Sequence, residues 1–205
     1  MISRRLFLTA TACLAAVATV TPAWAASAEP AATIDTFYGV LLGVMKDSAK
    51  LGFAGRHDKL APAIRQAFDL ALMTRLTVGL QWANLSPTEQ QQLVTAFSDF
   101  SIANYASQFD DYGGERFEVD PKADAAPGND QVVHTKLIQP KDKPVQLDYL
   151  MRQTQNGWKV IDVFLSGTIS QLAARRSEFS AVLRQEGPQG LVAVLKQKTA
   201  ALAGG

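Results

Sequence analysis

The sequence predicts an α+β fold in one domain, with an antiparallel sheet of about four strands and about six helices around it. Up to residue 109, apolar residues recur every three or four positions, which is typical of amphipathic helices. From residue 116 to residue 165 the apolar pattern alternates with a period of two, which indicates strands. Helical spacing returns after residue 171. Helices before and after a continuous run of strands favour an α+β fold over alternating α/β units.

The first predicted helices come from apolar spacing alone. A helix from Thr33 should end before Gly52, and a second helix should begin at Asp58, which can cap it. We expect this second helix to continue through four apolar residues on one face: Leu60, Ile64, Phe68 and Leu72.

The clearest helix start is the capping box Ser86-Pro87-Thr88-Glu89, which has proline at the first helical position. Phe97 and Phe100 form one apolar stripe of the helix that follows, whereas Tyr105 and Phe109 point more than about 100° away from it. A helix with two apolar faces must be covered on both sides or must border an apolar space.

Four strands are expected at residues 116–119, 132–139, 145–153 and 158–165, with a surface loop at 121–130. Asn156-Gly157 is a strong hairpin turn signal between the last two strands. Alternation predicts one continuous apolar face on these two strands, made of Val145, Leu147, Tyr149, Met151, Ile161, Val163 and Leu165. Two helices close the chain, one ending at Gly187 and the other starting at Pro188.

Residues 1–25 are predicted to be an export signal. Arg4 and Arg5 precede an apolar run that is too short to span a membrane, and Ala23-Trp24-Ala25 fits a cleavage site. The paired arginines also resemble the twin-arginine signal. We therefore expect a periplasmic protein whose mature part, residues 26–205, is a single domain.

Composition argues against several classes of function. The leader holds two of the 20 basic residues and none of the 19 acidic ones, so the mature chain has a net charge of −1, unlike a nucleic-acid binder. The only cysteine, Cys13, lies in the leader, and His57 and His134 have no second ligand at metal spacing. No nucleophile elbow or phosphate loop is present. We therefore expect neither an enzyme nor a cofactor or metal, and we expect Arg175 and Arg176 to face solvent, with an anionic head group as the alternative.

An ordered set of short motifs resembles the toluene-tolerance, or MlaC-type, family of periplasmic lipid-binding proteins. These motifs run through nearly the whole mature chain: Phe68-Asp69, Trp82, Leu85-Ser86-Pro87, Glu89-Gln90, Phe97, Tyr105, Gly157-Trp158-Lys159-Val160, Asp162-Val163, Gly167, Arg176 and Phe179. The resemblance implies a twisted antiparallel sheet clasped by helices around an apolar lipid cavity. It also implies a carrier that works with an inner-membrane lipid transporter and an outer-membrane complex, and that contacts membranes transiently.

Three segments look most like the hopanoid-associated branch of that family, called HpnM: residues 109–119, 147–150 and 162–170. The phospholipid branch more often has Glu-Gly-Val-Ser where this chain has Ser166-Gly167-Thr168-Ile169. The cargo suggested by the resemblance is therefore a hopanoid-like lipid or a phospholipid.

We expect apolar side chains from both the helices and the sheet to line the cavity. The candidates are Leu41, Val44, Phe68, Leu72, Phe97, Phe100, Tyr105, Phe109, Leu147, Tyr149, Met151, Val163 and Leu165. Two other readings stay open here. An enzyme acting on a polycyclic lipid would use a buried pair such as Asp162 and Tyr149, and an adaptor that binds only proteins would have a fully packed interior.

Overall fold

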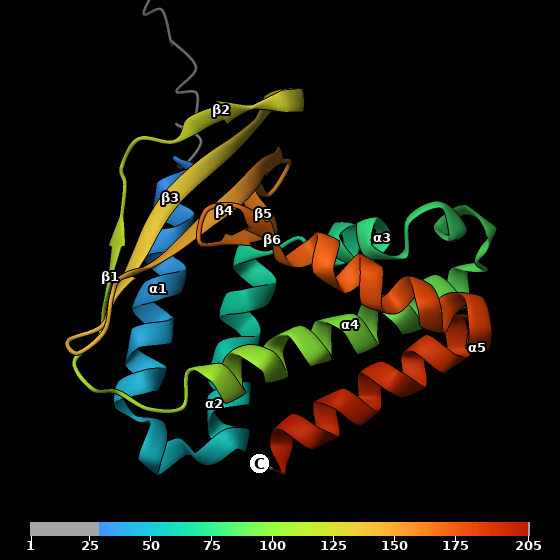
Figure 1. The fold of residues 1–205 in the computed structure, drawn as a ribbon, viewed down its shortest axis with the longest axis horizontal. Coiled ribbons are helices and arrows are strands. Elements are labelled where there is room, and N and C mark those ends of the chain that lie inside the picture. The colour runs from blue at the N-terminus through green and yellow to red at the C-terminus, as the bar shows by residue number, and fades with distance from the viewer. Residues whose placement is uncertain (1–28, 205) are drawn as a thin grey trace, which may run out of the picture.

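The computed structural model describes residues 29–204 and has the predicted α+β architecture (Figure 1). The expected leader at residues 1–25 lies outside this range. The helices are α1 (Pro30–Lys46), α2 (Ser48–Ala67), α3 (Leu70–Val78), α4 (Pro87–Gln108) and α5 (Gln171–Ala203), with short 3-10 helices η1 (Gly79–Asn84) and η2 (Pro127–Asn129). The strands are β1 (Arg116–Val119), β2 (Asp124–Ala126), β3 (Asp130–Ile138), β4 (Val145–Thr154), β5 (Gly157–Leu165) and β6 (Ile169–Ser170).

All strands form one antiparallel sheet in the order β1-β3-β4-β5-β6, with β2 also paired to β3. The four predicted strands are present within one or two residues of their expected bounds. The prediction of a loop at 121–130 is wrong, because Asp124–Ala126 forms a strand that pairs with Asp130–Val132 of β3. Three residues are too few to show alternation, so sequence reading missed β2, and it missed the two-residue β6 for the same reason.

A bulge in β5 sets which of its side chains face the helices. Leu150 pairs with Asp162 but Met151 pairs with Val160, which leaves Ile161 as the extra residue. Val160 and Val163 are three positions apart and would face opposite sides of a regular strand. With the bulge, Val163 lies opposite Tyr149 on the same sheet face as Val160 and Met151.

The second predicted helix ends earlier than expected. Phe68 has extended backbone (φ −108°, ψ 142°), and it forms a parallel bridge to Val160 of β5. The amide of Asp69 donates to the Val160 carbonyl at 2.9 Å, and the Asp69 carboxylate then caps α3 by accepting from the Leu72 amide. The expected continuous stripe from Phe68 to Leu72 is therefore wrong, because the helical phase restarts at Leu70.

The last two predicted helices are the two halves of α5, which fold back on each other in Figure 1. The break is at Gly187, whose φ is 70°, just before Pro188. Both halves are tied to α4: the Phe179 ring packs edge-on against Phe97, and Gln189 donates to Gln92 at 2.7 Å. One hydrophobic core joins α1 to α5 with β3, β4 and β5.

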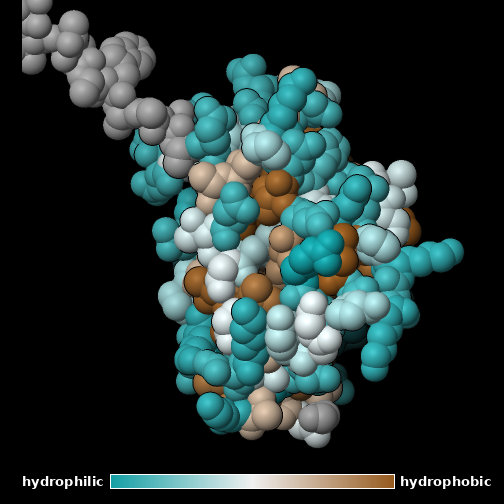
Figure 2. Space-filling model, turned by 90° about the vertical axis from the view of Figure 1, so that its left-hand side faces the viewer, coloured by the Kyte–Doolittle hydropathy of each residue, from teal (hydrophilic) through white to brown (hydrophobic). Residues whose placement is uncertain are grey.

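Surface hydrophobicity is low on the side of the molecule that carries β1 and α1. Figure 2 shows this side, where hydrophobic residues form small patches between polar ones. Within residues 29–204, no helix has both the length and the apolarity that a membrane span requires.

Candidate functional site

An apolar pocket lies between the face of β4 and β5 and the helices α3, α4 and α5. It encloses about 200 Å³, which is below the roughly 300–1,000 Å³ of typical small-ligand sites. Most of its wall is aliphatic or aromatic: Ile64, Phe68, Leu70, Met73, Phe97, Phe100, Tyr105, Phe109, Leu147, Tyr149, Val163, Leu165 and Leu172. Five polar residues complete it: Ser101, Asn104, Gln108, Gln171 and Arg175.

Two other hollows, near the β4–β5 turn, are more polar. One of about 280 Å³ lies between α1, α2 and β5, and one of about 370 Å³ lies beside Asp69. Both include Asn156 and Lys159 in their walls. A ligand with a large apolar body therefore fits the chemistry of the first pocket better than that of either hollow.

Aromatic rings build the inner wall of the pocket. Tyr105 stacks on Phe109 with ring centroids 5.7 Å apart, and it meets Phe68 edge-on at 5.7 Å. Phe37 lies behind them, 5.3 Å from Phe68 and 5.4 Å from Tyr105. Phe68 is held there by the bridge to β5, so the helix break places an aromatic ring in the wall.

The rim of the pocket carries a cation. Arg175 lies over the ring of Phe100 at 4.8 Å and pairs with Glu178 at 3.2 Å, while Lys198 holds the other Glu178 oxygen at 2.6 Å. Burial alone would raise the pKa of Glu178, but the hydrogen bonds to Lys198 and Arg175 outweigh it and lower this pKa. Arg175 is thus half-buried at the pocket, with 31% of its side chain exposed, and faces solvent only in part, whereas Arg176 is exposed as expected.

Nine of the predicted cavity residues line this pocket: Phe68, Phe97, Phe100, Tyr105, Phe109, Leu147, Tyr149, Val163 and Leu165. They come from three separate parts of the chain. The sheet residues among them lie on one face because Tyr149 pairs with Val163 and Leu147 pairs with Leu165. Their contact with a ligand stays a prediction.

Four predicted residues do not line it. Leu41 and Val44 are buried in the packed core on α1, away from the pocket. Met151 is also fully buried in the core, beyond the bulge. Leu72 is absent from the wall because the helix break at Phe68 changes the phase of α3, which presents Leu70 and Met73 instead.

Sequence reasoning missed the polar part of the wall. Ser101, Asn104 and Gln108 follow Phe97 at helical spacing on α4, so helical periodicity could have found them. Ile64 could have been found in the same way on α2. Gln171, Leu172 and Arg175 carried no signal, because only the packing of α5 against α4 brings them to the pocket.

The carboxylates of the sheet do not face the pocket. Asp162 pairs with Leu150, on the opposite face from Tyr149. Its oxygens accept from the amides of Val163 and Leu172 and from the Ser170 hydroxyl, which anchors the start of α5. The Asp162–Tyr149 pair that an enzyme would need is therefore not formed, and in residues 29–204 no cluster of three or more metal-binding side chains occurs.

The fold and the pocket together define a class: small α+β proteins with a sheet and helices around an apolar pocket. Residues 38–197 match the family model described as MlaC protein. The chain belongs to the MlaC family, as its motifs indicated.

A solved structure from Ralstonia solanacearum has the same fold, with a TM-score of 0.75 and 27% sequence identity. The similarity covers 86% of this chain and 99% of the Ralstonia chain. That protein is described as a phospholipid-binding protein in complex with a phospholipid.

Proposed function

We propose that this protein is a periplasmic carrier that binds one lipid in the apolar pocket and moves it between the inner and outer membranes without converting it. The observation that carries the proposal is the pocket wall, where thirteen of eighteen residues are aliphatic or aromatic. Membership of the MlaC family and the phospholipid complex of the Ralstonia structure support it.

Transfer free energy explains why such a carrier is needed. Each methylene group moved from water into an apolar site gains about 0.8 kcal/mol. A sixteen-carbon chain is therefore held in its membrane by roughly 12 kcal/mol on the same basis. A protein pocket that replaces one apolar environment with another lowers this barrier, and it needs no catalytic group to do so.

The cargo of the proposed carrier is a hopanoid-like lipid or a phospholipid. The segments at 109–119, 147–150 and 162–170 favour the hopanoid-associated branch, and the Ralstonia complex favours a phospholipid. Because the pocket encloses about 200 Å³, either lipid requires its walls to move apart. On one side the wall is formed by the helices α3 and α5, which are not strands of the sheet, so they can move apart without breaking the hydrogen bonds between strands.

The partners in this proposal are an inner-membrane lipid transporter, an outer-membrane complex and, briefly, the membrane surface. Delivery to either membrane requires the pocket to open beside that partner. Leu165 lines the pocket and is 37% exposed, so part of the apolar wall reaches solvent at the end of β5.

The test is lipid recovery from the purified protein, with one variant in the pocket and one beside it. Leu165 and Ile169 are paired across the β5–β6 hairpin, but only Leu165 lines the pocket. We expect Leu165→Asp to lower the amount of bound lipid about tenfold or more, because a carboxylate in the apolar wall must be desolvated. Ile169→Asp should leave the amount unchanged.

Mass spectrometry of the extracted lipids measures both variants against the unaltered protein. Absence of lipid from the unaltered protein, together with no binding when lipid is added back, would contradict the proposal. Equal loss of lipid from the two variants would show that the pocket is not the binding site.

A further inference from the structure

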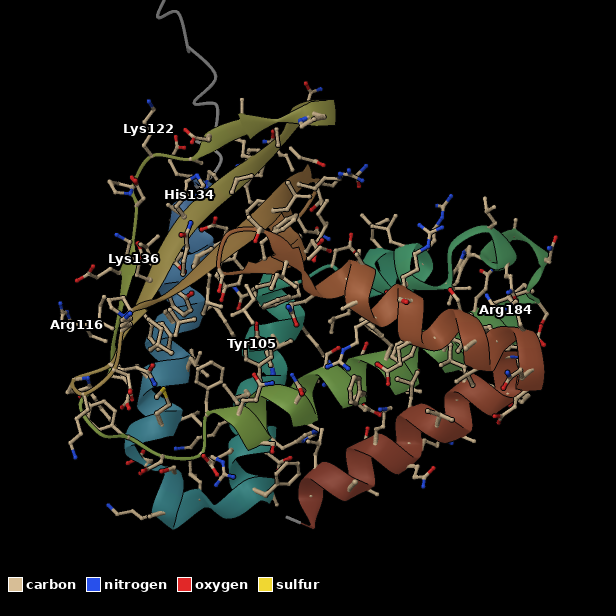
Figure 3. All side chains as sticks on the ribbon, viewed as in Figure 1. Tyr105, Arg116, Lys122, His134, Lys136 and Arg184 are labelled. Carbon is tan, nitrogen blue, oxygen red and sulfur yellow. The ribbon has the colours of Figure 1, made fainter. Side chains whose placement is uncertain are left out.

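The polar residues of the pocket lie where its wall reaches solvent. All five of them are half-buried or exposed: Ser101, Asn104, Gln108, Gln171 and Arg175. The fully buried lining residues are aliphatic or aromatic, for example Phe68, Phe97 and Phe100. Figure 3 shows another aromatic residue of the wall, Tyr105, extending from α4 into the space between that helix and the sheet. A ligand that matches this division has an apolar body and a polar end that stays near solvent.

Arg175 gives the polar part of the wall its charge. In the part of the chain that the structure describes, eighteen residues line the pocket, and Arg175 is the only one of them with an ionised side chain at neutral pH. The hydroxyl and amide groups beside it both donate and accept hydrogen bonds, so they fit many polar groups. A guanidinium only donates. The end of a ligand that meets Arg175 must therefore offer acceptors.

Two contacts hold the Arg175 guanidinium at the pocket. Its central carbon lies 4.8 Å from the ring centroid of Phe100 on α4, and its Nη1 donates to Glu178 Oε2 at 3.2 Å. Within residues 29–204, the bond to Glu178 is the only hydrogen bond that Arg175 makes. A guanidinium has five N–H groups, so most of its donors remain available to a ligand.

The charges around Arg175 leave an excess of positive charge beside the pocket. Lys198 lies 2.6 Å from the other oxygen of Glu178, so two cations share one carboxylate. Arg175 lines the pocket, whereas Glu178 and Lys198 lie outside its wall. The planar guanidinium matches phosphate and carboxylate groups, which it can bind through two parallel hydrogen bonds. The site therefore favours a ligand whose polar end is an oxyanion.

We propose that Arg175 selects the cargo of this pocket by binding a phosphate or carboxylate group at the polar end of a lipid. This inference rests on the proposed lipid-binding function and narrows the cargo to lipids with a negatively charged head group. The apolar body of the lipid occupies the buried part of the pocket, and the head group stays beside Arg175. A neutral lipid leaves the guanidinium with Glu178 and water as its partners, so it gains no ion pair.

The test compares two lipids with identical acyl chains, phosphatidic acid and diacylglycerol, which differ only in the phosphate group. Each is added in detergent micelles at increasing concentration to the purified, delipidated protein, and native mass spectrometry measures the lipid bound to the chain. We expect phosphatidic acid to bind about three- to tenfold more tightly, between the values for an exposed ion pair and for a buried charged hydrogen bond.

A third compound separates a lipid head group from a free phosphate. Glycerol 3-phosphate carries the same phosphate without the acyl chains. It should not displace phosphatidic acid at equal concentration, because the apolar wall supplies most of the binding free energy.

Two variants connect the preference to one side chain. Arg175→Gln should abolish the preference by weakening phosphatidic acid binding about three- to tenfold while diacylglycerol binding stays the same. Arg176→Gln is the matched control, since Arg176 is exposed and its guanidinium lies against Gly79, outside the pocket. This control should keep the preference. The comparison of the two lipids on the unaltered protein needs no variant, so it remains decisive if Arg175→Gln does not fold.

Each outcome separates this inference from the broader function. Equal binding of the two lipids, or an unchanged preference in Arg175→Gln, would overturn the inference and sustain the carrier function. Equal loss of the preference in both variants would overturn it as well, because general surface charge would then explain the preference. Displacement by glycerol 3-phosphate would also overturn it. Failure to bind phosphatidic acid, diacylglycerol and the polycyclic alcohol cholestanol would count against the carrier function itself.

Discussion

Buried carboxylates on the sheet hold structure together outside the pocket. Asp130 at the start of β3 receives two hydrogen bonds from Arg152 on β4, at 2.8 and 2.7 Å. This bidentate geometry raises the pKa of Arg152, mainly through its hydrogen bond to Asp130. Asp162 likewise receives hydrogen bonds at the start of α5. These carboxylates stabilise the ends of strands and of α5, and none of them lies on the face of the sheet that lines the pocket.

His134 on β3 lies between two carboxylates. Its Nδ1 is 3.1 Å from Asp148 Oδ1 and its Nε2 is 3.2 Å from Asp124 Oδ2, and the Asp148 side chain is 5% exposed. Figure 3 places His134 on the outer part of the sheet, away from Tyr105. Partial burial lowers the pKa of His134, but the neighbouring carboxylates of Asp148 and Asp124 outweigh burial and raise it.

This raised pKa predicts that His134 contributes stability that depends on pH. The unfolded value is about 6.5, so the contribution is fully present below that pH and is lost as the pH rises through the higher folded value. We expect His134→Gln to lower the free energy of unfolding more at pH 5.5 than at pH 8.5. The difference should be at most about 1 kcal/mol, since the ring is partly exposed.

Urea unfolding at the two pH values measures this effect. His57→Gln is the matched control, because the only carboxylate that His57 pairs with in residues 29–204 is Asp58, whose side chain is 84% exposed. An effect of His134→Gln that is equal at both pH values would show that the ion pairs do not depend on protonation of the ring.

At the scale of elements, glycine breaks decide where two long helices turn. Gly187 has φ 70° and ψ −171°, a combination that residues with a side chain avoid. A Cβ added there meets no atom within 4 Å, so crowding is not the reason for glycine. The backbone conformation itself requires glycine, and it lets the second half of α5 fold back along α4.

Gly187→Ala should therefore destabilise the protein by about 1–3 kcal/mol through backbone strain alone. Gly43→Ala is the matched control, because Gly43 lies inside α1 and an added Cβ there also meets no atom within 4 Å. This control should stabilise the helix by about 0.5–1 kcal/mol. Thermal and urea unfolding of both variants would measure the difference, and a stabilised Gly187→Ala would contradict the assigned strain.

Elements with a local signal were predictable, and those made by distant pairing were not. The capping box at Ser86 is present with both of its hydrogen bonds, and Gly187 ends a helix as expected. The break at Phe68 was missed because Leu60, Ile64, Phe68 and Leu72 continue a helical pattern. Only the bridge to Val160, more than ninety residues away, makes extended backbone favourable there.

At the scale of the whole molecule, the described domain is compatible with a cleaved leader. Cleavage after Ala25 would leave four residues before Pro30, where α1 begins with Pro30 and Ala31 already buried. No buried residue of α1 would be removed by such a cut. We therefore retain the proposal that residues 26–205 form the mature lipid-binding domain.

Export gives a prediction for the full chain. In cells that have the twin-arginine pathway, the periplasmic fraction should contain a chain that starts at Ala26, identified by intact mass spectrometry. Changing Arg4 and Arg5 to lysine should leave most of the protein in the cytoplasm with its leader attached, because this pathway reads the arginine pair. Unchanged export of the lysine variant would indicate the general secretory route. If the unaltered protein keeps its leader and stays in the cytoplasm, the prediction of export is contradicted.

The sequence by itself determined the fold class, the order of helices and strands, and the inward face of β4, because helical and strand periodicity and capping motifs are local. Its motifs also indicated the MlaC family. Tertiary structure alone decided which apolar residues are packed core and which line the pocket. Leu41 and Phe100 carry the same local signal, yet only Phe100 borders the space between α4 and the sheet. The half-buried position of Arg175 likewise arises from contacts with Phe100 on α4 and from packing between segments that are far apart in the chain.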